Sequence, residues 1–408
     1  THDPAKIASY DADPLITRCI AVNLLVDLFD AGRKLVKDAA AITVPTLVLT
    51  SGADWVVDRD IQREFFERLG SPVKEMHVYP GFFHDTFNEK DNHLPLSAAR
   101  RFILEAFAQP RREVSLLEAD RNSATQREYE TLANPLPPLS LKGIRYALTR
   151  FVLRTFGARL SEGVKLGVKT GFDSGTTLDY IYRNQAQGVT ALGRLIDRNY
   201  LDAIGWRGIR LRKTHLETLL RRAMIDLRAA GKPVHVVDIA AGHGRYVLDA
   251  VREHPDISAT GLLRDFSAAN VEAGRRLIAE YGLGDRFAFQ QGDAFDLASL
   301  AQLPRTATVG IVSGLYELFP ENGSVRASLA GLADAVVPGG YLIYTGQPWH
   351  PQIEFIARVL TSHRDGKRWV MRRRTQQEMD QLVAEAGFEK IAQETDPWGI
   401  FTVSLARR

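Results

Sequence analysis

A glycine-rich turn near residue 240 constrains the fold of this 408-residue chain more than any other feature. The stretch VVDIAAGHGR, residues 236–245, joins a β-branched apolar run to a helical pattern that starts at Tyr246. Gly242 and Gly244 allow positive φ angles and let a ligand approach the main chain closely. A strand, a glycine-rich turn and a helix in this order build ligand sites at the carboxyl ends of strands in open α/β sheets. We therefore predict an α/β domain with a ligand site at this turn.

The composition is that of a globular protein, with 45% hydrophobic and 25% charged residues. A net charge of +3 is too small to indicate nucleic acid as a partner. The single cysteine, Cys19, excludes an intrachain disulfide and fits a reducing compartment, so we expect a cytoplasmic protein. The sequence lacks an apolar run of about eighteen residues, so we expect no transmembrane helix.

Patterning divides the chain into four segments. Residues 1–109 alternate strand and helix signals, which predicts an α/β architecture. Residues 110–140 are charged and then proline-rich, which is typical of a linker. We expect residues 141–231 to be mostly helical and residues 232–408 to form a second α/β domain.

The spacing Asp238-x-Ala240-x-Gly242-x-Gly244 resembles motif I of class I S-adenosylmethionine-dependent methyltransferases. The resemblance covers roughly residues 200–408. It implies a Rossmann-like, mostly parallel sheet, S-adenosylmethionine as the cofactor, and no metal. The ending DPWGIFTVSLARR resembles the antiparallel last strand of that fold, with apolar residues 401, 403 and 405 expected to alternate with polar ones.

Later strands carry further residues of the resemblance. SATGLLRDFS, residues 258–267, contains Asp265, which by resemblance accepts hydrogen bonds from the ribose hydroxyls. FAFQQGDAF, residues 287–295, ends in an acid that would face the adenine amine, next to apolar residues against the ring. The resemblance thus implies the cofactor-binding residues Asp238, Ala240, Gly242, Gly244, Asp265, Asp293, Ala294 and Ser313.

Two other functions compete with methyl transfer. A nicotinamide-dependent oxidoreductase usually shows G-x-G-x-x-G, and the third glycine is absent here. A scaffold protein built from degenerate enzyme folds would perform no chemistry. A base is needed only if the acceptor must lose a proton, and His350, Tyr316 and Glu317 follow strand ends where a base could lie. Ordinary loop packing is the alternative for all three.

The first segment resembles the C-terminal part of α/β-hydrolases of the lysophospholipase or monoacylglycerol lipase kind. Its motifs are LTSGADWVVD, residues 49–58, and YPGFFHDTFNE, residues 79–89, so the resemblance implies Asp54 and His84 as the catalytic acid and histidine. The nucleophile motif G-x-S-x-G is absent from the sequence. Either the chain is a fragment of a longer bifunctional protein, which the non-Met start favours, or the segment is structural. If the chain is a fragment, we expect the missing half of the hydrolase to be a partner of this segment.

The middle segment contains a basic amphipathic stretch, Leu141–Leu160. One interpretation is a helical cap over the site, and the other is a helix on a membrane surface. Residues 168–188 combine glycines with aromatic residues, so we expect them to line a substrate pocket. The expected acceptor is a small molecule or a lipid-like compound, and the sequence leaves its reacting atom open.

Overall fold

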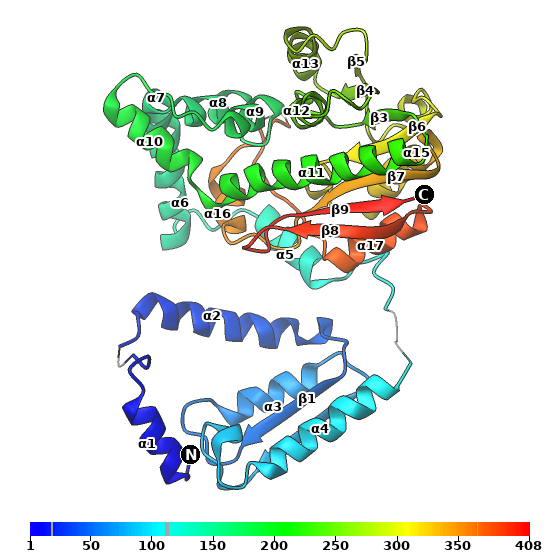
Figure 1. Ribbon diagram of the computed structural model, residues 1–408. Coiled ribbons are helices and arrows are strands. Elements are labelled where there is room, and N and C mark those ends of the chain that lie inside the picture. Colours follow the sequence, from blue (N-terminus) through cyan, green and yellow to red (C-terminus); the bar gives the residue numbers. More distant parts are fainter. Residues whose placement is uncertain (18, 111–113, 365) are drawn as a thin grey trace. The chain divides into compact units, whose positions relative to one another are not determined.

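The computed structural model describes residues 1–17, 19–110, 114–364 and 366–408. The chain forms two compact units, Thr1–Val114 and Ser115–Arg408 (Figure 1). Within the described residues, no helix is both long and apolar enough to cross a membrane.

Unit 1 is a small α/β layer around two parallel strands. β1 pairs with β2 from Thr46 opposite Lys74 to Ser51 opposite Tyr79, as the alternating pattern predicts. The elements of unit 1 are α1 (Pro4–Ala12), α2 (Val22–Asp38), η1 (Ala39–Ala41), β1 (Thr46–Ser51), α3 (Arg59–Arg68), β2 (Lys74–Tyr79), η2 (Thr86–Asn88) and α4 (His93–Ala108).

Unit 2 is built on a seven-stranded sheet with the order β5-β4-β3-β6-β7-β9-β8. The first five of these strands run parallel, whereas β9 pairs antiparallel with both β7 and β8. The predicted fold class, a mostly parallel sheet with an antiparallel last strand, is therefore confirmed. The strands are β3 (Val234–Asp238), β4 (Ala259–Asp265), β5 (Phe287–Gln291), β6 (Ala307–Val312), β7 (Val336–Gly346), β8 (Glu389–Thr395) and β9 (Thr402–Arg407).

The expected half-buried alternation along the last strand is wrong, because residues 401–406 are all buried. β9 lies inside the sheet between β7 and β8, and helices cover both of its faces. Val403 and Leu405 pack in the core that includes α11 (Ile204–Ala229), while Ala406 packs in the core that includes α17 (Gln376–Glu385).

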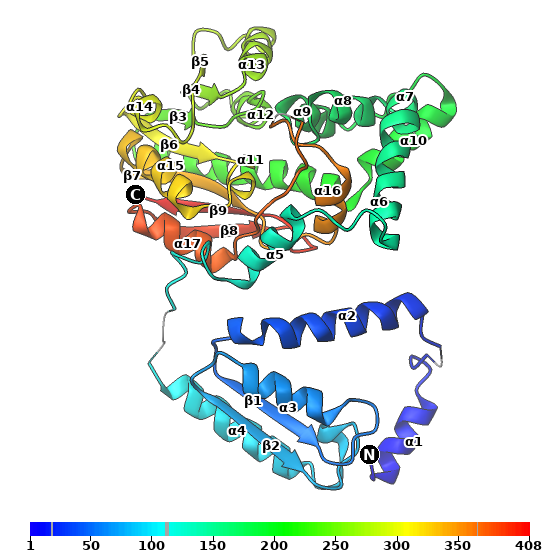
Figure 2. The same cartoon turned by 180° about the vertical axis from the view of Figure 1, so that it is seen from behind.

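Helices cover both faces of the sheet (Figures 1 and 2). One face carries α11, α12 (Arg245–Glu253) and α13 (Ala268–Glu280), and the other carries α14 (Leu297–Leu300), α15 (Asn322–Ala335) and α17. The chain leaves β3 toward β4 on one side, and β6 pairs with β3 on the other. In open α/β sheets, ligands bind at the carboxyl ends of strands where the order reverses in this way.

The predicted helical region precedes the sheet. Its helices include α6 (Leu141–Val152), η3 (Leu153–Gly157), α7 (Ala158–Leu160), α8 (Glu162–Thr170), α9 (Gly175–Arg183) and α10 (Ala191–Leu201), followed by α11. In α6 much of the apolar face is exposed, while Tyr146 packs against the core that includes α16 (Ile353–Val359). The membrane-surface interpretation of this helix stays a prediction.

The stretch expected to be a linker differs in the structure, because it contains α5 (Ala124–Ala133). Ser123 caps this helix by accepting a hydrogen bond from the Gln126 amide. Leu132 is buried, and Arg358 donates hydrogen bonds to the carbonyls of Thr131 and Leu132. The charged and proline-rich composition thus failed to predict a helix that packs within unit 2.

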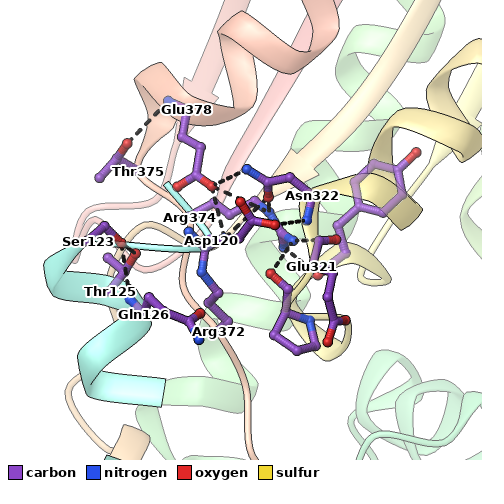
Figure 3. A network of polar contacts seen from close by, with 12 residues as sticks. Asp120, Ser123, Thr125, Gln126, Glu321, Asn322, Arg372, Arg374, Thr375 and Glu378 are labelled. Atoms are coloured by element: carbon purple, nitrogen blue, oxygen red, sulfur yellow. Dashed lines mark hydrogen bonds and ion pairs between the residues drawn. The ribbon is translucent and has the colours of Figure 1, made fainter. Parts of the chain in front are cut away.

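Two buried arginines fix the loop between β6 and α15 (Figure 3). Arg372 pairs with Glu378 at 2.9 Å. Arg374 donates to the main-chain carbonyls of Tyr316 at 2.6 Å and Phe319 at 2.8 Å. Buried charges of this kind are stabilised only when hydrogen bonds satisfy them. The network therefore holds a loop that follows the carboxyl end of β6.

Candidate functional site

A cavity of about 900 Å³ lies at the carboxyl ends of β3, β4, β5 and β6. We call it the strand-end cavity. Most of the residues that the sequence predicts for cofactor binding line it, although they come from four separate strands. These residues are Ala240, Gly242, Asp265, Asp293, Ala294 and Ser313.

Asp265 connects the glycine turn to the end of β4. One of its carboxylate oxygens accepts from the Gly242 amide at 2.9 Å, and the other accepts from the Ser267 amide and the Asn270 side chain, each at 2.9 Å. Burial raises the pKa of Asp265, and these hydrogen bonds oppose the rise. A carboxylate offers about four acceptor positions, so one remains for a ligand in the cavity.

Asp293 lies at the end of β5 next to an aromatic slot. One oxygen of its carboxylate accepts from the Phe295 amide at 2.8 Å, and the other accepts no hydrogen bond from the described residues. The rings of Phe295 and Phe319 have centroids 4.1 Å apart, and both residues line the strand-end cavity. This arrangement can hold the flat face of a ring while the acid accepts a hydrogen bond from its edge.

Two predicted cofactor residues do not line the cavity. Asp238 has no exposed surface and accepts from the Tyr246 hydroxyl at 2.7 Å and the Ala240 amide at 3.0 Å. Burial raises its pKa to about 7. Gly244 has φ +75° and begins α12, and a Cβ there would lie 2.5 Å from a methyl group of Leu263. Neither residue lines the cavity, so both stabilise the glycine turn, and the direct cofactor contact that the resemblance implies for them is wrong.

The motif of the glycine turn gave no indication of the contribution of α9. Its Asp179 accepts from Arg245 at 2.5 Å and lies 3.8 Å from His243 of the glycine turn. Burial opposes ionisation of this acid, but the interactions with His243 and Arg245 outweigh it and lower the pKa of Asp179. Gly175 also packs against the turn, since a Cβ at Gly242 would lie 3.5 Å from its Cα. The glycine- and aromatic-rich composition of residues 168–188 was the one signal for this role.

A second cavity of about 260 Å³ adjoins the first, and we call it the aromatic pocket. Its aromatic lining residues are Phe172, Tyr200, Trp206, Phe355, Trp369 and Phe401, and its polar ones include Arg212, Glu317, Gln347 and His350.

Of the candidate bases, His350 and Glu317 line the aromatic pocket, and Tyr316 does not. The Nδ1 atom of His350 accepts from the Gln352 amide at 3.0 Å, and burial lowers the pKa of the imidazole to about 4. The ring is therefore neutral near pH 7 with its proton on Nε2, which makes it a donor. Tyr316 is buried and its hydroxyl bonds to Ser328 at 2.9 Å, so it packs inside the domain.

In unit 1 the predicted acid and histidine meet. Asp54 and His84 lie 3.0 Å apart through Nδ1 of the imidazole. Burial opposes ionisation of Asp54, but hydrogen bonds from the Val56 amide and from His84 outweigh it and lower the pKa of this acid. The described residues contain no group of three or more His, Cys, Asp or Glu side chains that could hold a metal ion.

Known families match both parts of the chain. A family model described as "Putative methyltransferase" matches residues 99–408, and one described as "Serine aminopeptidase, S33" matches residues 1–91. The second match and the lipase below support the predicted α/β-hydrolase resemblance of the first segment.

Individual relatives extend over the whole chain or one part of it. The chain is 52% identical over 408 residues to "Uncharacterized protein YnbC" of Escherichia coli (strain K12), and it covers 69% of that protein. It is 30% identical over 105 residues to a monoacylglycerol lipase of Mycolicibacterium smegmatis, which is 26% of this chain and 38% of the lipase. A solved structure of a "possible exported protein" from Bordetella parapertussis aligns with 70% of this chain and 96% of its own, at 18% identity and a TM-score of 0.49.

The methyltransferase model spans more than half of the chain and contains the entire seven-stranded sheet. The resemblance predicted from the glycine turn is confirmed by this match. The chain therefore belongs to this methyltransferase family, with an α/β-hydrolase-type segment in front.

Proposed function

We propose that unit 2 binds S-adenosylmethionine in the strand-end cavity and transfers its methyl group to a small-molecule acceptor. One observation carries the proposal. Residues at the carboxyl ends of four neighbouring parallel strands line a single cavity, in the places that the resemblance implies: Gly242, Asp265, Asp293 and Ser313.

The side chains in this cavity fit the chemistry of the cofactor. The open acceptor position of Asp265 suits a ribose hydroxyl, and the free oxygen of Asp293 suits the exocyclic amine of adenine. Phe295 and Phe319 offer apolar faces for the ring. A volume of about 900 Å³ is within the range of cofactor sites.

The cofactor carries its own leaving group on the sulfonium, so it supplies the reactive methyl when bound. The task of the chain is then to hold an acceptor in line with that methyl and to exclude water. The aromatic pocket could hold the acceptor beside the cofactor, because it adjoins the strand-end cavity. Five residues line both cavities: Asp173, Leu178, Arg212, Gly314 and Leu318.

Calorimetric titration with S-adenosylmethionine tests the proposal. We expect saturable binding by the native protein and at least about tenfold weaker binding by Asp265→Ala, since charge-assisted hydrogen bonds contribute about 1.5–3 kcal/mol. Asp285→Ala is the matched control, because Asp285 is exposed on the loop before β5. Absence of binding by the folded native protein would favour a scaffold. Saturable binding of NADH in its place would favour an oxidoreductase.

We also propose that unit 1 carries the acid and the histidine of a hydrolase site. The Asp54–His84 pair supports this, because an acid that orients a histidine is the arrangement used to activate a serine. The sequence lacks a G-x-S-x-G motif, so we expect a fluorophosphonate probe to leave the 408-residue chain unlabelled. A labelled serine would place a nucleophile within the 408 residues and contradict this expectation.

A further inference from the structure

The lining of the aromatic pocket indicates which kind of ligand it fits. Phe172, Tyr200, Trp206 and Trp369 form a continuous set of ring contacts in its wall. The Trp206 and Trp369 centroids are 6.1 Å apart with planes 19° apart, and Tyr200 lies 5.7 Å from Trp206 and 6.3 Å from Phe172. Rings of this kind pack best against a flat apolar body.

Arg212 lies where the aromatic pocket meets the strand-end cavity. Its side chain is 3% exposed, yet its guanidinium donates no hydrogen bond to the described residues. It lies 5.1 Å from the centre of the Phe401 ring. The absence of a side chain at Gly314 leaves room for it, since a Cβ there would lie 2.9 Å from the guanidinium nitrogens. A buried donor without an acceptor is costly, so the site is prepared for an oxygen from a ligand.

Glu317 is the acid nearest to this cation. Its Oε1 lies 3.7 Å from a guanidinium nitrogen of Arg212, which is too long for a hydrogen bond. The carboxylate accepts no hydrogen bond from the described residues and lines the aromatic pocket. A donor and an acceptor that form an ion pair without a hydrogen bond therefore lie side by side. A hydroxyl group matches both, because it accepts through its oxygen and donates through its proton.

Two further side chains present donors to the pocket, whereas the Asp173 carboxylate accepts from the Ser362 hydroxyl and the His363 amide. The Nδ1 atom of His350 is occupied by the Gln352 amide, which leaves Nε2–H as a donor. The Nε2 amide of Gln347 has no partner among the described residues. An oxygen ligand can accept from these two donors, whereas an ammonium ligand could pair only with acceptors elsewhere in the pocket, such as the Glu317 carboxylate.

We propose that the aromatic pocket binds the methyl acceptor, and that this acceptor is a compact aromatic compound whose hydroxyl group lies between Arg212 and Glu317. The assignment of this pocket to the methyl acceptor rests on the proposed function, whereas binding of a ligand to the pocket is independent of the cofactor. A volume of about 260 Å³ suits a ring system better than a long acyl chain. The compact aromatic acceptor replaces the lipid-like acceptor expected from the sequence.

Quenching of tryptophan fluorescence tests the proposal on the native protein without S-adenosylmethionine. Trp206 and Trp369 report directly on the pocket. We expect 2-naphthol to bind at least about tenfold more tightly than naphthalene, since only the naphthol makes hydrogen bonds to the charged pair. Equal affinities of the two would overturn the hydroxyl site. Binding of 1-decanol as tightly as 2-naphthol would overturn the ring specificity.

A charge-neutralising variant provides the second test. At pH 7 the carboxylate of 2-naphthoate meets the Glu317 carboxylate, so we expect Glu317→Gln to bind this anion at least about fivefold more tightly than the native protein does. Glu389→Gln removes an exposed acid from β8 and should leave the affinity unchanged. An unchanged affinity in Glu317→Gln would contradict the placement of the ligand oxygen. Calorimetry with S-adenosylmethionine decides the proposed function separately, so either one can fail alone.

Discussion

Asp238→Asn tests the assignment of the acid in the glycine turn to a supporting role. The carboxyl of Asp238 has no exposed surface, and burial raises its pKa from 3.8 to about 7. A raised folded-state pKa means that the native state holds the proton more tightly than the unfolded state does. The contribution of this group to stability is therefore fully present below pH 3.8 and is lost as the pH rises through about 7.

The magnitude follows from the two pKa values. Between pH 5 and pH 8 the native protein should lose about 3 kcal/mol of unfolding free energy through this group. Asparagine resembles the protonated acid, because one atom accepts from the Ala240 amide while the other can donate to the Tyr246 hydroxyl. Asp238→Asn should therefore gain about 3 kcal/mol relative to the native protein over this pH range.

Urea unfolding followed by tryptophan fluorescence measures this difference, since four of the five tryptophans lie in unit 2. The exposed Asp285→Asn is the control and should follow the native protein at both pH values. A difference between Asp238→Asn and the native protein that stays constant from pH 5 to pH 8 would refute the reasoning. Loss of S-adenosylmethionine binding by a folded Asp238→Asn variant would show that this acid contributes to cofactor binding.

Two further predictions concern single contacts. Gly244→Ala combines a positive φ with a Cβ 2.5 Å from Leu263, whereas Gly231→Ala has a positive φ but open space around the Cβ. We therefore expect Gly244→Ala to lose about 1–3 kcal/mol more unfolding free energy than Gly231→Ala in urea unfolding. Equal losses in the two variants would contradict the contact with Leu263. His84→Ala removes a hydrogen bond that favours the ionised form of Asp54, so the pKa of this acid should rise in a ¹³C NMR titration. An unshifted titration would show that the pair does not form in solution.

Local patterns predicted the parts of the site that follow from one strand and its turn. Gly242, Asp265 and Asp293 each lie at the end of a strand or in the turn that follows it, and parallel strands bring such ends to one edge. Asp238 has the same pattern but is fully buried and does not line the cavity. An acid at a strand end can face a ligand or hold the turn, and only the burial of the folded chain distinguishes the two.

The sequence predicted only parts of the aromatic pocket, such as the stretch 168–188 that contains Phe172, because the lining residues come from distant segments. Phe172, Trp206, Trp369 and Phe401 lie on four separate stretches and share no motif. The helix within the expected linker was missed for a related reason. Its stability comes from Arg358, far along the chain, which caps the carbonyls at the end of α5. Local composition does not record partners of this kind.

A crystal structure of the protein grown with S-adenosylhomocysteine tests the central claim most directly. The account predicts ligand density in the strand-end cavity, with the ribose hydroxyls against Asp265 and the adenine amine against Asp293. The sulfur should face the aromatic pocket, where the two cavities share Arg212 and Gly314. Density elsewhere in the molecule, or an adenine remote from Asp293, would contradict the assignment of this cavity to the cofactor.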